Sequence, residues 1–411
     1  MTQVLSVAPA TEWTFNSFTP EVLPEPRVVE VSVVIPCLNE ADTIGTCIQK
    51  AQCALREHGI SGEVVIADNG STDGSREIAR QLGARVICVA NPGYGSALMG
   101  GIEGALGRYI IMGDADDSYD FLELPKFIEK LREGHDLVQG CRLASGGGTI
   151  KPGAMPFSHR WIGNPLFSWL VRRWFQAPIH DVYCGLRGFS KNLYQRLGQR
   201  CTGMEFATEM IIKASLNRHR IAEVPITLHP DGRKSHPPHL RTFSDGWRTL
   251  RFFLMCSPRW LFFIPGAALA MLGVIGYMLA MPATTFRGIT FDAHTLLFAS
   301  LFILCGYQSV WFAVLAKTFA ITEGLLPEDK QLTRLFRFIN LEKGLLAAAA
   351  CIIIGGILLV WAIQAWFASG FGRLDYAVTM RRVVPGATLV ALGFQTGLSS
   401  FFISLLGMRR K

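Results

Sequence analysis

The sequence predicts an α/β domain with a mostly parallel sheet, followed by an α-helical transmembrane region of about four helices. In residues 30–235, runs of β-branched residues alternate with segments of helical pattern, which indicates right-handed crossovers between parallel strands. In residues 258–411, long uncharged runs are separated by charged connectors. The mean hydropathy of +0.29 is high for a soluble enzyme and agrees with a membrane-embedded part.

The first segment of the chain carries no strand or helix signal. Residues 1–29 are rich in Pro, Thr and Glu, and we expect them to form a poorly ordered tail. They hold no basic stretch followed by an apolar one, so we predict no secretory signal. The ten cysteines show no C-x-x-C spacing, which favours reduced thiols in a cytosolic compartment.

The predicted sheet consists of short apolar runs, each followed by a turn signal or a helical pattern. Runs of this kind, with little alternation, are typical of strands that are covered by helices on both faces. The predicted strands are 31–39, 62–68, 84–90, 108–116 and 136–141, and the predicted helices between them are 40–58, 74–82, 95–106 and 121–133.

Polar side chains follow three of these strands at the point where each strand ends. Asn39 ends the first strand, Asp68 ends the second, and the acidic cluster 114–117 follows the fourth. Ligands of open α/β sheets bind outside the carboxyl ends of the strands. We therefore expect these side chains to meet in one crevice, although they are far apart in sequence.

The acidic cluster itself indicates a divalent cation. Asp114 and Asp116 lie one residue apart at a strand end and can point the same way. Carboxylates placed so suit Mg²⁺ or Mn²⁺, which share coordination with a diphosphate and offset the mutual repulsion of the acids. The alternative is a solvated acidic turn that caps the helix at 121, a role that we assign to Asp117 and Asp120.

The second half of the chain is predicted to span a membrane. Residues 236–257 are predicted to form a juxtamembrane amphipathic helix. Basic residues before the first span, in the connector 323–343 and at the C-terminus place these parts in the cytoplasm, whereas the basic connector 369–383 departs from this pattern. Core helices of a soluble protein are the alternative, and four successive apolar runs argue against it. The predicted spans are about 260–281, 294–318, 344–368 and 384–407.

The positive charge of the chain also favours a membrane. A formal net charge of +8 is typical of proteins that bind nucleic acid or an anionic membrane surface. Many Arg residues lie near the apolar runs, so we expect a membrane partner and no nucleic acid. Residues 159–175 mix Trp and Phe with basic residues, which predicts a helix at the level of the lipid headgroups. An ordinary amphipathic core helix is the alternative.

Seven sequence blocks within residues 30–235 resemble the family 2 glycosyltransferases of the GT-A fold, a Rossmann-like fold with a mostly parallel sheet. Within this family the chain is most similar to the polyprenyl-phosphate sugar transferases, of which dolichol-phosphate mannose synthase is typical. The order and spacing of the blocks are far more specific than any one of them. The blocks are VVIPCLNE (33–40), ADNGSTDGS (67–75), NPGYGSAL (91–98), GDADDS (113–118), QGCRL (139–143), DVYCGLRGFS (181–190) and AEVPITL (222–228).

The resemblance implies roles for particular residues on the donor side. Asp114 and Asp116 match the pair that binds the metal and the diphosphate, so both are expected to contact donor and cation. Asp181 lies in the block near the reacting sugar, where it either orients the sugar or acts as a base. The other residues expected to bind the nucleotide-sugar are Pro36, Asn39, Glu40, Asp68 and Gly95.

The resemblance also implies an acceptor site that holds a lipid phosphate. Arg142 matches an arginine that meets phosphate and is expected to be catalytic. Arg160 and Asn164, four residues apart, resemble the pair that holds the acceptor phosphate at the membrane surface. After the last block the usual Arg is displaced, so Arg233, Lys234 or His229 takes its place, and Arg233 is our prediction.

The resemblance implies an inverting, metal-dependent transfer of a hexose from a nucleotide-sugar, linked to UDP or GDP, to a polyprenyl phosphate. The enzyme would be a multi-pass membrane protein with a cytoplasmic catalytic domain. One alternative is a processive polysaccharide synthase, although no Q-x-x-R-W block is present. The other alternative is a non-enzymatic lipid carrier or scaffold. The sequence leaves open the sugar, the length of the lipid and whether the chain forms a homo-oligomer.

Overall fold

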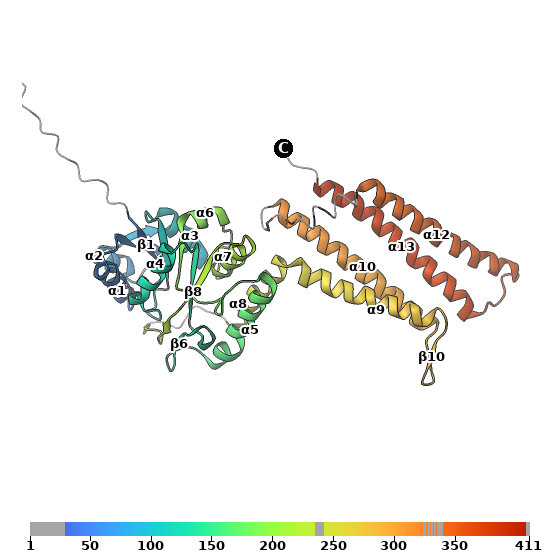
Figure 1. The fold of residues 1–411 in the computed structure, drawn as a ribbon, viewed down its shortest axis with the longest axis horizontal. Coiled ribbons are helices and arrows are strands. Elements are labelled where there is room, and N and C mark those ends of the chain that lie inside the picture. The colour runs from blue at the N-terminus through green and yellow to red at the C-terminus, as the bar shows by residue number, and fades with distance from the viewer. Residues whose placement is uncertain are drawn as a thin grey trace, which may run out of the picture.

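The computed structural model describes residues 29–234, 242–323 and 340–407, together with positions 326, 327, 329, 332 and 334. Figure 1 shows an α/β domain and, beside it, a row of long helices. The predicted N-terminal tail lies outside the described residues, apart from Val29. The first residues of the predicted juxtamembrane helix, 236–241, also lie outside them.

The α/β domain is built on a seven-stranded sheet with the strand order β3-β2-β1-β4-β7-β5-β8. The prediction of a mostly parallel sheet is confirmed, because β7 alone among these strands runs antiparallel to its neighbours β4 and β5. The strands are β1 (Val31–Cys37), β2 (Gly62–Asp68), β3 (Arg85–Cys88), β4 (Tyr109–Met112), β5 (Leu137–Cys141), β7 (Arg187–Ser190) and β8 (Ile221–Pro225).

Helices cover both faces of the sheet, as the near-continuous apolar strands predict. Along β1, Val33 and Ile35 pack into one hydrophobic core and Val34 into the other, because successive side chains of a strand point to opposite faces. The first core includes α1 (Ile44–Glu57), α2 (Ser75–Gln81) and α4 (Leu124–Arg132). The second core includes α3 (Tyr94–Gly104), α5 (Asn164–Phe175), α6 (Lys191–Leu197) and α7 (Glu205–Leu216).

A short two-stranded sheet lies beside the main one. Its strands are β6 (Thr149–Ile150) and β9 (Thr227–Leu228), which run parallel. The segment after β9 turns back across the acidic cluster, because His229 N donates to Ser118 O at 2.9 Å and Gly232 N donates to Asp116 O at 2.9 Å. A stretch near the end of the α/β domain is therefore placed over the end of β4.

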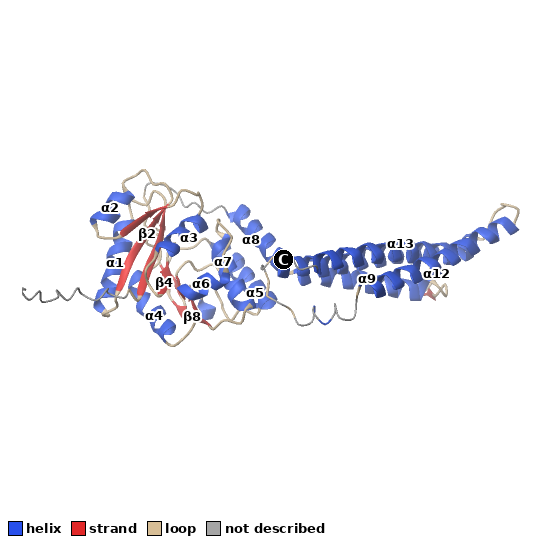
Figure 2. Ribbon diagram, turned by 90° about the horizontal axis from the view of Figure 1, so that it is seen from above, coloured by secondary structure: helices blue, strands red, loops and turns tan. Residues whose placement is uncertain are grey.

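Four helices are long and apolar enough to cross a membrane, as predicted. Helix α9 packs on α10, α10 on α13 and α13 on α12, and Figures 1 and 2 together show these helices as a single thin layer. Glycines allow the close contacts between α9 and α10 and between α12 and α13. The helices are α9 (Ile264–Ala280), which continues the helical turn Arg259–Phe263, α10 (Ala293–Thr322), α12 (Leu341–Ala368) and α13 (Tyr376–Gly407).

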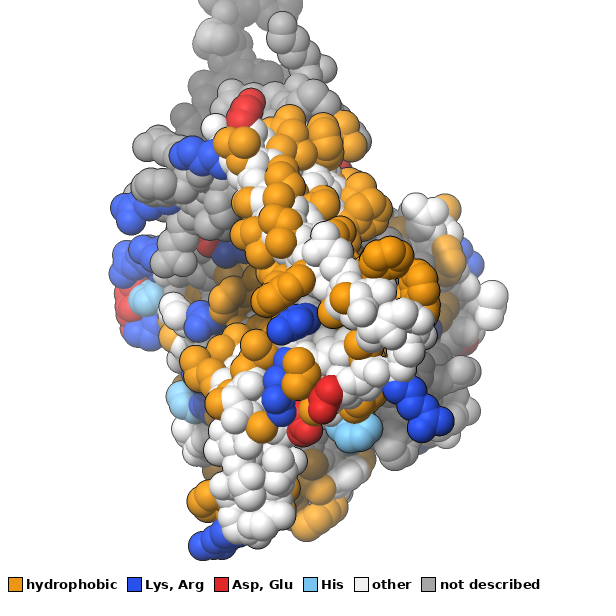
Figure 3. All heavy atoms as spheres, turned by 90° about the vertical axis from the view of Figure 1, so that its right-hand side faces the viewer, with side chains coloured by type: hydrophobic (Ala, Val, Ile, Leu, Met, Phe, Trp, Pro, Cys, Tyr) orange, Lys and Arg blue, Asp and Glu red, His pale blue; other side chains and the backbone are white. Residues whose placement is uncertain are grey.

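The two parts meet through an aromatic junction. Helix α8 (Thr242–Cys256) inserts Phe253 beside Phe175 of α5, with the ring centroids 6.0 Å apart. Trp260, just before α9, stacks on Trp174 of α5 at 5.6 Å. The loops that join α9 to α10 and α12 to α13 lie at the opposite end of the layer, where Figure 3 shows mainly hydrophobic side chains with a few charged ones.

Candidate active site

The end of β1 leads into a tight turn that is held by the loop after β2. Asn39 adopts a left-handed backbone conformation with φ of 59°, which Asn tolerates better than most residues. Its side-chain oxygen accepts from Thr72 N at 2.8 Å, and its backbone N donates to Ser71 Oγ at 2.9 Å. The next amide, Glu40 N, donates to Ser75 Oγ at 2.9 Å. These bonds join the ends of two neighbouring parallel strands, as the sequence predicts.

Asp68 ends β2 and lies beneath this turn. It is 1% exposed and accepts hydrogen bonds from Gly70 N at 3.1 Å and Ser71 N at 3.2 Å. Pro36 lies beside it, paired with Ala67 in the parallel ladder. The carboxylate of Asp68 therefore shapes the loop after β2, and its predicted contact with a nucleoside stays a prediction.

Asp114 follows β4 and is half-buried. Tyr94 Oη donates to Asp114 Oδ1 at 2.8 Å. Burial and the neighbouring charge of Asp116 raise the pKa of Asp114 to about 6. The backbone of Gly185 lies against this carboxylate, and a Cβ there would come within 2.5 Å of Asp114 Oδ2. Asp114 is thus confined by groups from three segments of the chain.

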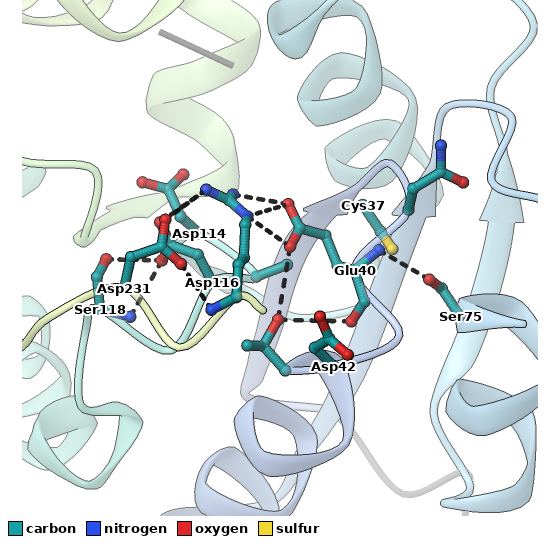
Figure 4. Close-up of polar contacts among 12 residues, drawn as sticks. Cys37, Glu40, Asp42, Ser75, Asp114, Asp116, Ser118 and Asp231 are labelled. Atoms are coloured by element: carbon teal, nitrogen blue, oxygen red, sulfur yellow. Dashed lines mark hydrogen bonds and ion pairs between the residues drawn. The ribbon is translucent and has the colours of Figure 1, made fainter. Parts of the chain in front are cut away.

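Asp116 lies near Asp114, as Figure 4 shows. We call the space beside these two carboxylates the acidic crevice. Ser118 donates to Asp116 Oδ1 from its backbone N at 3.0 Å and from its hydroxyl at 2.6 Å. The other carboxylate oxygen, Oδ2, faces Arg233 Nη1 at 3.6 Å. One oxygen is therefore fixed by the turn, and the other is directed at a cation.

Arg233 is held mainly by Glu40. Its Nε lies 2.8 Å from Glu40 Oε2 and its Nη2 lies 2.6 Å from Glu40 Oε1. Its Nη1 also contacts Asp231 Oδ2 at 2.8 Å. The structure thus brings Glu40 and Arg233 together, although the sequence assigned one to the donor and the other to the acceptor.

Two further acids nearby, Asp117 and Asp120, have separate partners. Asp120 Oδ1 accepts from Leu122 N at 3.1 Å at the start of the next helical turn. Asp117 has φ of 58° and pairs with Lys50 Nζ at 2.8 Å. Both are turn and cap residues, so of the four acids the pair Asp114 and Asp116 faces the crevice.

Arg142 and Asp181 form a buried ion pair. Arg142 Nε lies 2.7 Å from Asp181 Oδ2, and Arg142 Nη2 lies 2.9 Å from Oδ1. The backbone N of Arg142 also donates to Asp181 Oδ2 at 3.0 Å. Burial of two charges is tolerated here because the geometry is bidentate. The remaining guanidinium nitrogen, Nη1, approaches Tyr119 Oη at 3.4 Å.

Arg187 at the start of β7 is a buried cation whose charge interacts with Asp114, and the sequence analysis did not single it out. Its side chain is fully buried, and burial lowers its pKa although the charge of Asp114 acts on it in the opposite direction. Its Nη2 donates to Cys184 O at 2.8 Å and its Nη1 donates to Ala207 O, while its Nε has no hydrogen-bond partner among the residues that the structure describes. The signal was present, because Arg187 belongs to the same block as Asp181.

The loop before α3 reaches this cluster from the other side. Asn69 fixes it, since Gly93 N donates to Asn69 Oδ1 at 2.7 Å. Gly95 is required by a close approach of the backbone, because a Cβ there would lie 2.5 Å from Cys201 O. Gly95 therefore places Tyr94 against Asp114, and its predicted contact with the nucleotide-sugar stays a prediction.

The predicted acceptor residues lie on a different segment. Arg160 sits in a π-helical turn, His159–Gly163, with its guanidinium carbon 5.4 Å from the centre of the Trp161 ring. Asn164 is 8% exposed and its Nδ2 contacts Met155 Sδ at 3.3 Å. The structure places these residues beside one another and among exposed apolar side chains, but it records no contact from them to the acidic crevice among the described residues.

The residues present fit a divalent cation that is shared with a ligand. Among the described residues, no three or more His, Cys, Asp or Glu side chains are arranged to enclose a metal ion. Asp114 and Asp116 are two hard oxygen donors at one crevice, and burial together with the charge of Asp116 raises the pKa of Asp114. Mg²⁺ and Mn²⁺ are commonly held by one or two carboxylates together with substrate phosphates.

Comparisons with known proteins agree with this architecture. Residues 32–198 match the family model Glycosyl transferase family 2, and residues 314–407 match the Glycosyltransferase family 2 C-terminal transmembrane region. The Low-salt glycan biosynthesis hexosyltransferase Agl6 of Haloferax volcanii is 38% identical over 381 residues, which cover 92% of this chain and 89% of that protein. The fold and the matches define a membrane-embedded glycosyltransferase. The chain belongs to glycosyltransferase family 2.

Two further proteins are similar to about half of the chain. The Dolichyl-phosphate hexose transferase of Haloferax volcanii is 33% identical over 198 residues, which cover 48% of this chain and 82% of that protein. The glucosyl-3-phosphoglycerate synthase of Mycobacterium tuberculosis, crystallised with Mn²⁺, uridine diphosphate and glucosyl-3-phosphoglycerate, is 23% identical, with a TM-score of 0.44. That likeness covers 55% of this chain and 78% of that one.

Proposed function

We propose that this glycosyltransferase transfers a hexose from a nucleotide-sugar to a polyprenyl phosphate, with inversion at the anomeric carbon. The observation that carries the proposal is the pair Asp114 and Asp116, which face one crevice of a domain that is packed against membrane-spanning helices. The similarity to a hexosyltransferase and to a dolichyl-phosphate hexose transferase supports the sugar class and the lipid acceptor.

The reaction breaks the bond between the anomeric carbon and the diphosphate oxygen of the donor. An oxygen of the lipid phosphate forms the new bond from the opposite face, and the nucleoside diphosphate leaves. The acceptor is already an anion at neutral pH, so proton removal contributes little. Asp114 and Asp116 would hold Mg²⁺ or Mn²⁺, which supplies positive charge for the leaving diphosphate.

The protein itself supplies alignment and charge. The charges of Arg142 and Arg233 both lower the pKa of Asp114. In this proposal Arg142 stabilises the phosphate charge and Asp181 holds Arg142 in position. The bidentate pair occupies both oxygens of Asp181, which supports a positioning role for Asp181 over a base role. Pro36, Asn39, Asp68 and Gly95 shape the nucleoside side of the crevice.

The lipid substrate would approach from the aromatic side of α5. Trp161 and Ile162 in the turn before it, and Trp169 within it, are each at least half exposed, which suits contact with lipid. Arg160 and Asn164 would hold the acceptor phosphate at this level. The basic residues that precede the first membrane-spanning segment, among them Arg248, Arg251 and Arg259, support a cytoplasmic catalytic domain. We propose residues 30–235 as the catalytic domain and 258–411 as the membrane domain.

The test is transfer from a panel of radiolabelled UDP- and GDP-sugars to a short polyprenyl phosphate in detergent, with Mn²⁺ and with EDTA. We expect one donor to give a metal-dependent product that carries a single sugar on the lipid. A growing polysaccharide would support a processive synthase, and no transfer from any donor would support a carrier or scaffold. Donor hydrolysis without a lipid product would overturn the acceptor assignment.

A further inference from the structure

Arg233 lies where three carboxylates converge. Its side chain is only 11% exposed. Its Nη2 lies 2.6 Å from Glu40, and its Nη1 lies 2.8 Å from Asp231 and 3.6 Å from Asp116. Glu40 itself is 5% exposed and 193 residues away in sequence. Figure 4 shows Glu40 on one side and Asp116 and Asp231 on the other. A positive charge thus already stands beside the acids that are proposed to hold a cation.

Backbone hydrogen bonds hold the segment that carries Arg233. Gly232 N donates to Asp116 O at 2.9 Å, and Lys234 N donates to Asp42 Oδ2 at 3.0 Å. These bonds fix both neighbours of Arg233 to the ends of β4 and β1. The fold therefore places the guanidinium among the carboxylates of Glu40, Asp231 and Asp116.

We infer that Arg233 is a resident counter-cation of the crevice and that Glu40 is a positioning residue that holds it there while the donor is absent. The inference rests on the proposed function, because it concerns the same divalent cation. The guanidinium and the cation compete for Asp116. A nucleoside diphosphate relieves this competition, because its oxygens offer the planar guanidinium a bidentate partner other than a carboxylate.

The short distance between Arg233 and Asp116 sets how strongly the Arg233 charge should affect Mn²⁺ affinity. Unit charges within about 4 Å of one another interact appreciably at the effective dielectric of a protein surface, although flexibility and solvent weaken the interaction. Removing the charge of Arg233 should therefore strengthen Mn²⁺ binding without nucleotide by roughly tenfold. The same change should reduce the factor by which nucleotide tightens Mn²⁺ binding. The reason is that the nucleotide no longer has to relieve repulsion between Mn²⁺ and the Arg233 charge.

The experiment measures Mn²⁺ binding by the full-length protein in detergent, from the electron paramagnetic resonance signal of free Mn²⁺, with no nucleotide and then with UDP or GDP. Arg233→Gln removes the charge and Arg233→Lys keeps it. Arg196→Gln removes one positive charge at the exposed end of α6 and serves as the matched control. We expect tighter binding without nucleotide for Arg233→Gln only, and a smaller gain on adding nucleotide for that variant.

The outcomes separate this inference from the proposed function. If wild-type protein binds no Mn²⁺ even with nucleotide, the proposed metal-dependent function fails. If wild-type protein binds Mn²⁺ and Arg233→Gln binds it no more tightly, the proposed metal-dependent function stands. The inference that Arg233 is a counter-cation is then overturned. If Arg233→Lys binds as tightly as Arg233→Gln, charge is not the cause and the inference is overturned as well.

Discussion

Arg142 and Asp181, 39 residues apart in sequence, are joined by a bidentate ion pair in the interior of the α/β domain, with Nε and Oδ2 2.7 Å apart. Asp181 is fully buried and Arg142 is 8% exposed. The pair links the loop after β5 to the segment before β7, and it directs the third guanidinium nitrogen toward Tyr119. This ion pair gives a structural reason for the acid Asp181 in the block 181–190 and for Arg142 in the block 139–143.

Asp181→Asn should destabilise the protein by about 3–5 kcal/mol, because it leaves the charge of Arg142 buried without its partner. Thermal unfolding of the full chain in detergent measures this effect. The double variant Arg142→Met with Asp181→Leu should regain most of the stability but no transferase activity. A single variant that unfolds like the wild type but has lost turnover would instead support a base role for Asp181.

Mn²⁺ binding should weaken as the pH falls through about 6. The pKa of Asp114 is raised to about 6 by burial and by Asp116, so below that value the carboxyl is protonated and cannot hold a cation. The hydrogen bond from Tyr94 lowers this pKa. Tyr94→Phe should therefore move the loss of binding to higher pH. Mn²⁺ titrations at several pH values test this, with Tyr194→Phe as control, and an unmoved midpoint in Tyr94→Phe would contradict it.

Gly185→Ala should impair the crevice without unfolding the protein. The new Cβ would lie 2.5 Å from Asp114 Oδ2 and 3.0 Å from a ring carbon of Tyr119. We expect turnover to fall by roughly tenfold or more, because small displacements of reacting groups are costly. Gly246→Ala in α8 is the control, since no atom lies within 4 Å of its added Cβ. Equal turnover in the two variants would argue against a role for Asp114.

Arg160→Ala should raise the KM for polyprenyl phosphate and leave the KM for the donor unchanged. The reason is that Arg160 lies beside exposed aromatic residues and apart from the acidic crevice. Steady-state kinetics with each substrate varied in turn provide the measurement. Arg173 is a second basic residue of this region, with its guanidinium over the Trp260 ring. Arg173→Ala therefore tests whether loss of any positive charge beside the membrane raises the KM for the lipid. A weaker affinity for the donor in Arg160→Ala would show that the acceptor assignment is wrong.

Five of the parallel strands could be predicted from the sequence, whereas β8 was not predicted. Apolar runs such as 31–37 and 62–68 are long enough to specify strands, and helical patterns between them specify crossovers. From this the meeting of Asn39, Asp68 and Asp114 at one edge follows without knowledge of side-chain contacts. The four membrane-spanning helices could be predicted for the same reason, because a bilayer requires a length of apolar sequence that few other structures need.

Other features depend on contacts that no local pattern encodes. Strand β7 is only four residues long and runs against its neighbours, and its central Gly188 gives no alternating signal. The pairing of Glu40 with Arg233 joins residues at opposite ends of the domain. Arg187 was overlooked because a lone Arg within an apolar block looks like a surface residue until the fold buries it.

The most direct measurement is the rate of hexose transfer to polyprenyl phosphate by Asp116→Asn and by the wild type, in detergent with Mn²⁺ and the preferred donor. Asparagine keeps the shape of the side chain and removes the charge that faces the cation site. We predict a loss of at least about a hundredfold in turnover, with thermal unfolding unchanged. A variant that is folded and transfers sugar at the wild-type rate would contradict the account that Asp114 and Asp116 hold the cation for the leaving diphosphate.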